Sequence, residues 1–396
     1  MRAVTWQKKG TVEVSEVADP VVQKPTDAIV RVTSTALCGS DLHLYSVLGP
    51  FLSKGDILGH EAMGIVEEVG SAVTHVQPGD RVVVPFNISC GHCRMCRMDL
   101  QSQCETTQQT EQDKGAALLG FTKLYGSVPG GQAERLRVPH ADYGLVKVPE
   151  SGADEHYLYL SDILPTAWQG VKYAGIEEGS TAVIVGLGPV GQLAAACAQH
   201  LGASKVIGLD LVPERLARAK QRGVTTIDIT TVKDVEKSVR ELTDGLGADG
   251  VVDAVGMEAH GNPIAGLATS ATSSLPGPIA RAAIERAGID RLAALHTAIT
   301  CARRGGTVSI SGVYGGMADP MPMMTMFDRQ LTLRMGQCNV RRWTDELRGL
   351  LDGGADPFGV DDLATHRVPL SEAPAAYEMF QKKQDGCIKV ILDPAG

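Results

Sequence analysis

The sequence lacks an excess of positive charge and has no long uninterrupted hydrophobic run. Its 37 lysine and arginine residues are outnumbered by 46 aspartate and glutamate residues, which gives a formal net charge of −9. Such an acidic chain is poorly suited to bind nucleic acid or an anionic membrane surface. The most apolar window, residues 182–201, is interrupted by three glycines and one proline. It therefore predicts a strand, a turn and a helix rather than a membrane span.

Features of a secreted protein are also lacking. The first nine residues contain no apolar stretch of the kind found in a signal peptide. The nine cysteines would be at risk in an oxidising compartment. We therefore expect a cytoplasmic protein. The 396 residues, with a hydrophobic content of 43%, suffice for two domains with full cores.

The hydrophobic pattern changes along the chain. In the first third, branched residues alternate with polar ones and predict strands at 28–33, 64–69 and 80–85. From about residue 163, short apolar strands alternate with alanine-rich helical stretches, at 181–185, 189–201, 205–209 and 213–222. Such βαβ alternation implies a parallel sheet. A β-like pattern returns after Leu331, and residues 387–392 predict a closing strand. The chain is therefore expected to leave its first domain, build a second and return.

Four cysteines in one short stretch carry the most specific motif. Cys90, Cys93, Cys96 and Cys104 follow the spacing C-x2-C-x2-C-x7-C. Four thiolates at this spacing can close the coordination shell of one tetrahedral zinc, which makes such a site structural. The alternative is a set of disulfides or unrelated free thiols. Disulfides do not suit an intracellular chain, so we predict a structural zinc.

A second motif is typical of dinucleotide binding. The segment Gly186-Leu-Gly188-Pro-Val-Gly191 follows a predicted strand and opens a predicted helix, which allows pyrophosphate to approach backbone N–H groups. Asp210 ends the next strand and could accept hydrogen bonds from both ribose hydroxyls, favouring NAD over NADP. Arg215 could reach the ribose or a phosphate, or could be a solvated helix residue. The alternative for the glycines is an ordinary turn of an α/β fold.

Parts of a second metal site are spread along the chain. Cys38 follows a predicted strand and His60 comes about twenty residues later. A catalytic zinc needs a third protein ligand and an open position, and Asp162 is a candidate. A lone cysteine or histidine is more often a core residue. Cys38 and His60 are therefore candidate ligands only because they occur together with the other motifs. Asp162 could instead cap a helix, because Pro165 follows closely.

These motifs occur in one order that resembles a known family. The segments Cys38-Gly-Ser-Asp-Leu-His and Gly59-His-Glu, the cysteine lobe, the glycine turn and Asp210 resemble the zinc-dependent medium-chain alcohol dehydrogenases. The segment 161–166 and an insertion after Gly256 resemble the branch of glutathione-independent formaldehyde dehydrogenase and formaldehyde dismutase. The resemblance implies an α/β fold, with a doubly wound parallel Rossmann domain and a mostly β GroES-like catalytic domain.

The resemblance also implies domain boundaries. The catalytic domain would span residues 1–162, with its zinc lobe at 88–106, and the chain would return to it at 337–396. The NAD-binding domain would span residues 163–336, with the insertion at 258–291.

Roles follow from the resemblance, residue by residue. Cys38, His60 and Asp162 would hold a catalytic zinc, and Glu61 would lie behind it or act as a transient ligand. Ser40 and His43 would relay a proton to solvent, although local turn hydrogen bonding is the alternative for both. The residues expected around NAD are Thr166, Gly186, Gly188, Pro189, Val190, Gly191, Asp210, Arg215, Val255 and Gly256. His75, His92 and His140 have no such company and are expected at the surface.

The predicted function is hydride transfer between NAD and a small alcohol or aldehyde hydrate, such as hydrated formaldehyde, with two zinc ions per chain. If NAD never leaves the protein, a second aldehyde could reoxidise NADH, and the net reaction would be dismutation. The alternatives are a polyol or longer-chain alcohol dehydrogenase and, outside enzymes, a zinc-ribbon module that binds nucleic acid or protein. The acidic charge, the second metal set and the glycine turn argue against that module. We expect a homo-oligomer, with a tetramer favoured over a dimer.

The insertion at 258–291 is rich in alanine, serine, proline and glycine. It leaves the carboxyl end of a predicted parallel strand, where ligands bind in such sheets. We therefore predict a lid over part of the NAD site that slows cofactor release. The alternatives are a solvated surface loop and a subunit contact.

Overall fold

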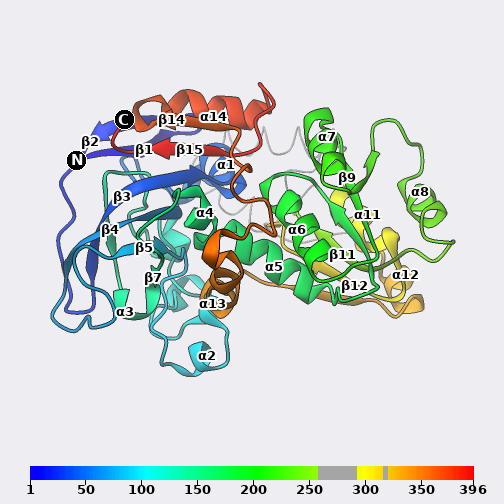
Figure 1. Ribbon diagram of the computed structural model, residues 1–396, viewed down its shortest axis with the longest axis horizontal. Helices are drawn as coiled ribbons and strands as arrows, with labels where there is room; N and C mark the ends of the chain where they lie inside the picture. The colour runs from blue at the N-terminus through cyan, green and yellow to red at the C-terminus, as the bar shows by residue number, and fades with distance from the viewer. Residues whose placement is uncertain (257–291, 315–319) are drawn as a thin grey trace. The chain divides into compact units, whose positions relative to one another are not determined.

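The structure, a computed structural model, describes residues 1–256, 292–314 and 320–396 (Figure 1). The predicted insertion at 258–291, with its lid role, lies outside the described residues. The chain forms two compact units. The first unit contains Met1–Pro165 and Cys338–Gly396, and the second contains Thr166–Gln337. Within the described ranges, no helix combines the length and apolar character needed to cross a membrane.

A seven-stranded sheet forms the frame of the first unit. Its order is β14-β15-β3-β4-β5-β7, and β6 pairs with β3 outside this path. The bounds are β3 Ala28–Leu37, β4 Glu61–Val69, β5 Arg81–Val84, β6 Arg135–Val138, β7 Val146–Lys147, β14 His366–Pro369 and β15 Val390–Asp393. A separate antiparallel pair contains β1 Arg2–Lys8 and β2 Thr11–Glu16. The strands predicted in the first third of the chain are therefore present.

The return segment, residues 338–396, is less β-rich than predicted. The residues directly after Leu331 form β13, Thr332–Met335, which belongs to the sheet of the second unit. The return segment itself contains the helices α13, Val340–Leu351, and α14, Ala373–Lys382, besides two short strands. Amphipathic helical spacing was therefore overlooked there. The closing strand was placed nearly correctly, because β15 pairs antiparallel with the end of β3.

Apart from α13 and α14, the helices of the first unit are short. They are α1 Gly39–Ser46, α2 Arg94–Arg97, α3 Ala141–Gly144 and α4 Glu155–Leu158, and α5 Ile163–Tyr173 runs across the boundary of the two units. One hydrophobic cluster joins β1, α1 and α14 through residues such as Val4, Leu44 and Tyr377. This packing holds α1 at the end of β3.

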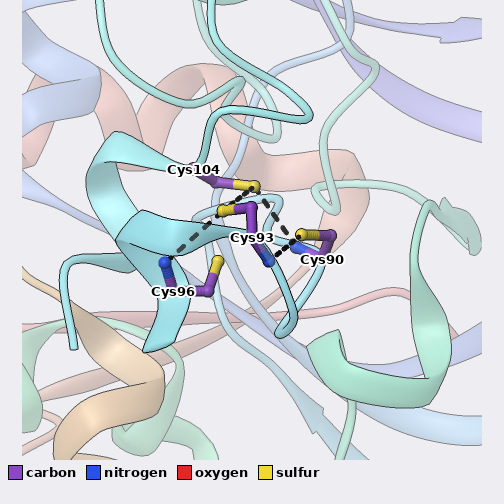
Figure 2. Close-up of side chains that lie close together, drawn as sticks. All are labelled: Cys90, Cys93, Cys96 and Cys104. Atoms are coloured by element: carbon purple, nitrogen blue, oxygen red, sulfur yellow. Dashed lines mark hydrogen bonds between the residues drawn. The ribbon is translucent and has the colours of Figure 1, made fainter. Parts of the chain in front are cut away.

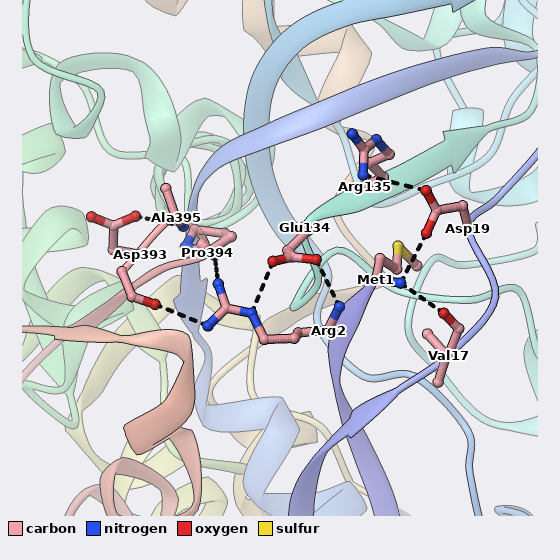
Figure 3. Close-up of polar contacts among 10 residues, drawn as sticks. Met1, Arg2, Val17, Asp19, Glu134, Arg135, Asp393, Pro394 and Ala395 are labelled. Carbon is pink, nitrogen blue, oxygen red and sulfur yellow. Dashed lines mark hydrogen bonds and ion pairs between the residues drawn. The ribbon is translucent and has the colours of Figure 1, made fainter.

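Polar contacts tie the beginning of the chain to its end (Figure 3). The guanidinium of Arg2 donates to the carbonyl oxygen of Pro394 at 2.9 Å and to the carboxylate of Glu134 at 2.8 Å. The amino group of Met1 forms an ion pair with Asp19 at 2.8 Å. These contacts are exposed or only partly buried, so each stabilises the fold only modestly.

The second unit contains six parallel strands in the order β10-β9-β8-β11-β12-β13. In chain order this is 3-2-1-4-5-6, the arrangement of a doubly wound dinucleotide fold. The strands are β8 Thr181–Val185, β9 Lys205–Asp210, β10 Thr225–Asp228, β11 Ala248–Asp253, β12 Ala302–Ile310 and β13. The helices are α6 Pro189–His200, α7 Pro213–Gln221, α8 Val235–Glu241, α11 Ala293–Cys301 and α12 Met323–Asp328. The predicted α/β class with a parallel sheet is confirmed.

The glycine turn joins β8 to α6. Gly186 has a φ of +87°, which favours glycine, and Gly188 caps the helix with Pro189 at its first position. A Cβ atom at Gly191 would clash with the carbonyl oxygen of Gly186. The third glycine therefore permits close approach of the helix to the strand.

We predict that Gly191→Ala lowers the thermal midpoint of unfolding. The added methyl group forces the turn and α6 apart, at a cost of about 1–3 kcal/mol. Differential scanning calorimetry measures the shift. The control is Gly349→Ala in α13, where an added Cβ meets no atom within 4 Å and better helix propensity should raise stability slightly. A variant at Gly191 as stable as the wild type would contradict the close approach.

Candidate metal centres and nucleotide turn

The four cysteines of the predicted lobe converge around α2 (Figure 2). The sulfur atoms of Cys90, Cys93, Cys96 and Cys104 all lie within 4.8 Å of one another. All nine cysteines of the chain are free, so the disulfide alternative is not realised. A set of four converging thiols with no other donor type suits zinc.

Hydrogen bonds to sulfur favour deprotonation of one cysteine of the lobe, whereas burial raises the pKa of Cys96. Backbone N–H groups of Cys90, Cys93 and Cys96 donate to the sulfurs of Cys104, Cys90 and Cys93 at 3.4, 3.3 and 3.4 Å. The hydroxyl of Thr106 donates to Cys90 Sγ at 3.1 Å. Burial raises the pKa of Cys93, but hydrogen bonds donated by backbone N–H groups outweigh it and lower that pKa to about 6. The lowered pKa favours the thiolate, the form that binds metal.

A second cluster collects residues from three distant segments. Cys38 caps α1 after β3, His60 directly precedes β4, Glu61 is its first residue, and Asp162 follows the short 3₁₀ turn Tyr159–Ser161. Antiparallel pairing of β3 with β4 places Glu61 opposite Ala36. One ligand atom from each of the four residues lies within 4.8 Å of the others, and all four residues are buried. The structure therefore brings together the ligands predicted for the catalytic metal, with Glu61 beside them.

Distances within the second cluster are short. Asp162 Oδ2 lies 3.4 Å from Cys38 Sγ and 3.3 Å from His60 Nε2. Burial, together with the nearby carboxylates of Asp162 and Glu61, raises the pKa of Cys38 to about 11. Burial also raises the pKa of Glu61, and its Oε2 atom has no hydrogen-bond partner in the described part of the chain.

This donor set fits a zinc ion. A buried thiol, an imidazole and two carboxylates offer the S, N and O ligands that zinc accepts. The same groups are costly to bury in their charged forms without a compensating cation. A divalent metal among Cys38, His60 and Asp162 would remove that cost.

Gly59 allows His60 to approach the cluster. It has a φ of +97°, and a Cβ atom there would clash with the side chain and backbone of Gln132. A glycine is therefore required directly before the histidine, which explains the Gly59-His-Glu segment physically.

Asp41 is a functional candidate to which the sequence reasoning assigned no role. Its Oδ1 atom lies 3.2 Å from His60 Nδ1, and its Oδ2 atom accepts the backbone N–H of Cys38 at 2.9 Å. Burial lowers the pKa of His60, but the carboxylate of Asp41 and further hydrogen bonds raise it well above its ordinary value. A carboxylate behind a metal-binding histidine fixes the tautomer of the ring. Its place inside the Cys38-Gly-Ser-Asp segment was the available signal.

Lys389 was also missed. The side chain is fully buried, and its Nζ atom donates to Glu61 Oε1 at 2.6 Å and to the carbonyl oxygen of Leu37 at 2.8 Å. This ion pair opposes the negative charge of the cluster. No local pattern marks Lys389, because it reaches Glu61 only through the pairing of β15 with β3.

The two residues of the predicted proton relay lie on α1. Ser40 Oγ is 2.9 Å from His60 Nε2, so its hydroxyl faces the cluster. His43 follows three residues later, which places it on the same side of the helix. The side chain of His43 is buried, with 7% exposure, so delivery of a proton to solvent stays a prediction. His75 and His92 are exposed, and His140 is partly buried.

Asp210 lies beside the glycine turn in the second unit. Its carboxylate accepts the backbone N–H groups of Leu187, Leu211 and Val212 at 2.6, 2.7 and 2.9 Å. A carboxylate has about four acceptor positions, so these bonds hold its orientation and leave room for another donor. Contact with a ribose stays a prediction.

Other predicted cofactor residues surround the same turn. Arg215 lies beside Gly188, where a Cβ atom would be 3.6 Å from its Nη1 atom. The Nε atom of Arg215 is buried without a hydrogen-bond partner among the described residues. The side chain of Val255 would meet a Cβ atom at Gly186. An arginine next to helix N–H groups suits a phosphate.

Three further residues that were predicted to bind NAD lie in or near the second unit's helices and strands. Val190 lies in the first turn of α6 and Thr166 lies in α5. The N–H of Gly256 donates to Asp253 Oδ1 at 3.3 Å.

Comparison with known proteins agrees with this architecture. The profile of the alcohol dehydrogenase GroES-like domain matches residues 24–150, and that of the zinc-binding dehydrogenase matches residues 189–275. The chain is 40% identical to an uncharacterized zinc-type alcohol dehydrogenase-like protein, AdhB, of Bacillus subtilis, over 100% of both chains. It is 34% identical to formaldehyde dismutase of Pseudomonas putida, over 93% of this chain and 90% of that protein. The solved structure of alcohol dehydrogenase TADH from Thermus sp. ATN1 matches with a TM-score of 0.82 at 36% identity, covering 99% of each chain.

A GroES-like β unit and a doubly wound parallel sheet together define the architecture of a medium-chain dehydrogenase. The chain belongs to the zinc-type alcohol dehydrogenase family. The predicted family and fold class are confirmed.

We predict that Cys96→Ser reduces the zinc content by one ion per chain and lowers the thermal midpoint of unfolding. Loss of one ligand removes folding free energy coupled to metal binding. Elemental analysis and calorimetry measure both effects. The control is Cys197→Ser, a buried cysteine of α6 outside either cluster, which should keep its zinc. Unchanged zinc content and stability in Cys96→Ser would show that the lobe holds no zinc.

Proposed function

We propose that this protein is a zinc- and NAD-dependent dehydrogenase that oxidises a small alcohol or aldehyde hydrate. The observation that carries the proposal is the buried convergence of Cys38, His60 and Asp162 in a chain of this family. The cysteine lobe would hold a second, structural zinc. In this proposal residues 1–162 and 337–396 form the catalytic domain and residues 163–336 the NAD-binding domain, in a cytoplasmic enzyme.

The chemistry divides between the bound groups and the side chains. Zinc supplies a Lewis acid that lowers the pKa of a bound hydroxyl, and NAD accepts a hydride from carbon. Cys38, His60 and Asp162 would hold the metal and leave one position open. Ser40 would accept the hydroxyl proton of the substrate at its Oγ atom while passing its own proton on to His43. Glu61, held by its ion pair with Lys389, would stay in a fixed position beside the metal ligands while the proton is transferred.

Hydrated formaldehyde is our preferred substrate. It is a gem-diol, so the site can treat it as an alcohol and oxidise it to the acid. The 34% identity to a formaldehyde dismutase across 93% of the chain supports this choice. The same resemblance supports dismutation as a variant, in which the cofactor is retained and a second aldehyde oxidises NADH back to NAD. A polyol or longer-chain alcohol is the alternative substrate class.

NAD is preferred over NADP in this proposal. Asp210 lies at the carboxyl end of β9, where a negative charge would repel a 2′-phosphate. Its three backbone hydrogen bonds keep that carboxylate in place. Gly186, Gly188 and Gly191 would receive the pyrophosphate at the start of α6, with Arg215 beside it.

We also propose that the protein is a homo-oligomer, with a tetramer favoured, and that α12 and β13 form one of its contacts. The exposed apolar side chains there are Met323 at 64%, Met324 at 72%, Phe327 at 78% and Met335 at 64%. Within the described part of the chain, β13 is an edge strand. Exposed apolar patches and open strand edges mark association surfaces.

For the oligomer, we predict that Phe327→Glu yields a smaller species than the wild type in light scattering after size exclusion. A buried unpaired carboxylate would oppose the contact. The control is Leu246→Glu, also exposed at 66% in the second unit, which should leave the size unchanged. Wild-type size in Phe327→Glu would place the contact elsewhere.

For the activity, we predict reduction of NAD, followed at 340 nm, with formaldehyde preferred in a panel of small and longer alcohols, polyols and aldehydes. Each substrate is tested with NAD and with NADP, and with no added cofactor. Cys38→Ser should abolish turnover and lose one zinc, while the fold and the lobe zinc survive. A fully active, two-zinc Cys38→Ser enzyme would refute the assignment of the catalytic site, and equal rates with NADP would refute the role of Asp210.

A further inference from the structure

A buried chain of hydrogen bonds runs from the C-terminal helix α14 to the second cluster. The hydroxyl of Tyr377 donates to Gln132 Oε1 at 2.8 Å, and Gln132 Nε2 donates to Asp41 Oδ2 at 3.1 Å. Asp41 in turn faces His60 Nδ1 at 3.2 Å. Tyr377, Gln132 and Asp41 are each 0% exposed, and His60 is 4% exposed. Water therefore does not compete for these contacts.

The hydrogen bonds in this series all donate in one direction, from Tyr377 toward Asp41. Asp41 Oδ2 accepts hydrogen bonds from the backbone N–H of Cys38 and from Gln132, so the amide of Gln132 presents its NH₂ group to Asp41. The amide oxygen then faces Tyr377, whose hydroxyl can donate. The hydrogen bond from Tyr377 therefore holds the Gln132 amide in the orientation that Asp41 requires. Without that donor, the oxygen end of the amide loses its partner and the side chain is held less firmly against Asp41.

The backbone of Gln132 is also fixed beside the histidine. Its N–H donates to the carbonyl oxygen of Leu58 at 3.0 Å, and its carbonyl oxygen accepts the N–H of Val4 at 2.8 Å. Its side chain fills the space that a Cβ atom at Gly59 would need. The residue that holds Asp41 therefore packs against the backbone directly before His60.

Asp41 connects this chain to two proposed metal ligands. Its Oδ2 atom accepts from both Gln132 and the backbone N–H of Cys38, while Oδ1 faces the ring of His60. A rotation of the carboxylate would disturb both ligands together. We propose that Gln132 and Tyr377 are positioning residues that hold Asp41, and through it His60, in the geometry required for metal binding.

The inference rests on the proposed catalytic zinc site. It goes beyond that site, because it assigns a positioning role to Tyr377, a residue of the return segment. Partners that orient a metal-binding histidine typically change metal affinity by about 10- to 100-fold when removed. Gln132 acts one contact further away, so we expect a loss of about 10-fold for Gln132→Met, at the lower end of that range. Tyr377→Phe, which keeps the ring, should lose less.

The test measures metal binding in the full-length protein. Chelator competition gives separate dissociation constants for the two zinc ions of the wild type, Gln132→Met and Tyr377→Phe. Visible absorption after replacement of zinc by Co²⁺ reports the ligand geometry at the second cluster. The matched control is Tyr45→Phe, because the ring of Tyr45 packs on Tyr377 at 5.4 Å between centroids and loses the same hydroxyl group.

We expect weaker binding at the second cluster and a changed Co²⁺ spectrum in Gln132→Met and Tyr377→Phe. The affinity of the cysteine lobe should be unchanged in both, and Tyr45→Phe should resemble the wild type. Wild-type affinity and spectrum in both variants would overturn the inference alone. Equal loss of zinc affinity at both metal sites, or the same loss of affinity in Tyr45→Phe, would overturn the inference. Either result would show that the substitutions act on folding in general. A wild type that binds no metal at the second cluster would overturn the proposed function and the inference together.

Discussion

The first unit is organised around a concentration of buried acidic groups. Cys38, Asp41, Glu61 and Asp162 are all buried, and each can carry a negative charge. Unpaired charges of this kind cost several kcal/mol in a protein interior. The neighbouring cationic groups within the described residues are the ring of His60 and the ammonium of Lys389. A cation in the cluster would therefore lower the cost of burying these groups. The surrounding residues hold the cluster in the geometry that such a cation needs.

That constraint explains why the chain returns to its first unit. The return segment supplies β15, which pairs with β3 directly before Cys38. It also places Lys389 in contact with Glu61 and Tyr377 in contact with Gln132. Two buried polar side chains of the C-terminal part therefore stabilise the residues around the cluster. The second unit needs no such support, because the turn from β8 to α6 lies within one continuous segment and depends on backbone groups.

Much of this protein could be predicted from sequence because its signals are local. The C-x2-C-x2-C-x7-C spacing confines four thiols to one short loop, and the structure brings them within 4.8 Å. The glycine turn predicted its flanking strand and helix almost to the residue. After Leu331 the predicted β-like pattern holds for β13 but missed the helices α13 and α14. Their amphipathic spacing was present in the sequence and was overlooked.

By itself, the sequence determined the donor types, the order of the motifs and the alternation of strands and helices, since these depend on spacing along the chain. Only the tertiary structure decided how Cys38, His60 and Asp162 meet, since sheet pairing and the turn before α5 join segments more than a hundred residues apart. It also revealed Lys389, Gln132 and Tyr377. Their partners lie 328, 91 and 245 residues away along the chain. A buried hydrogen bond of that separation leaves no periodic trace in the sequence, because burial and partner choice arise only when the strands and helices pack.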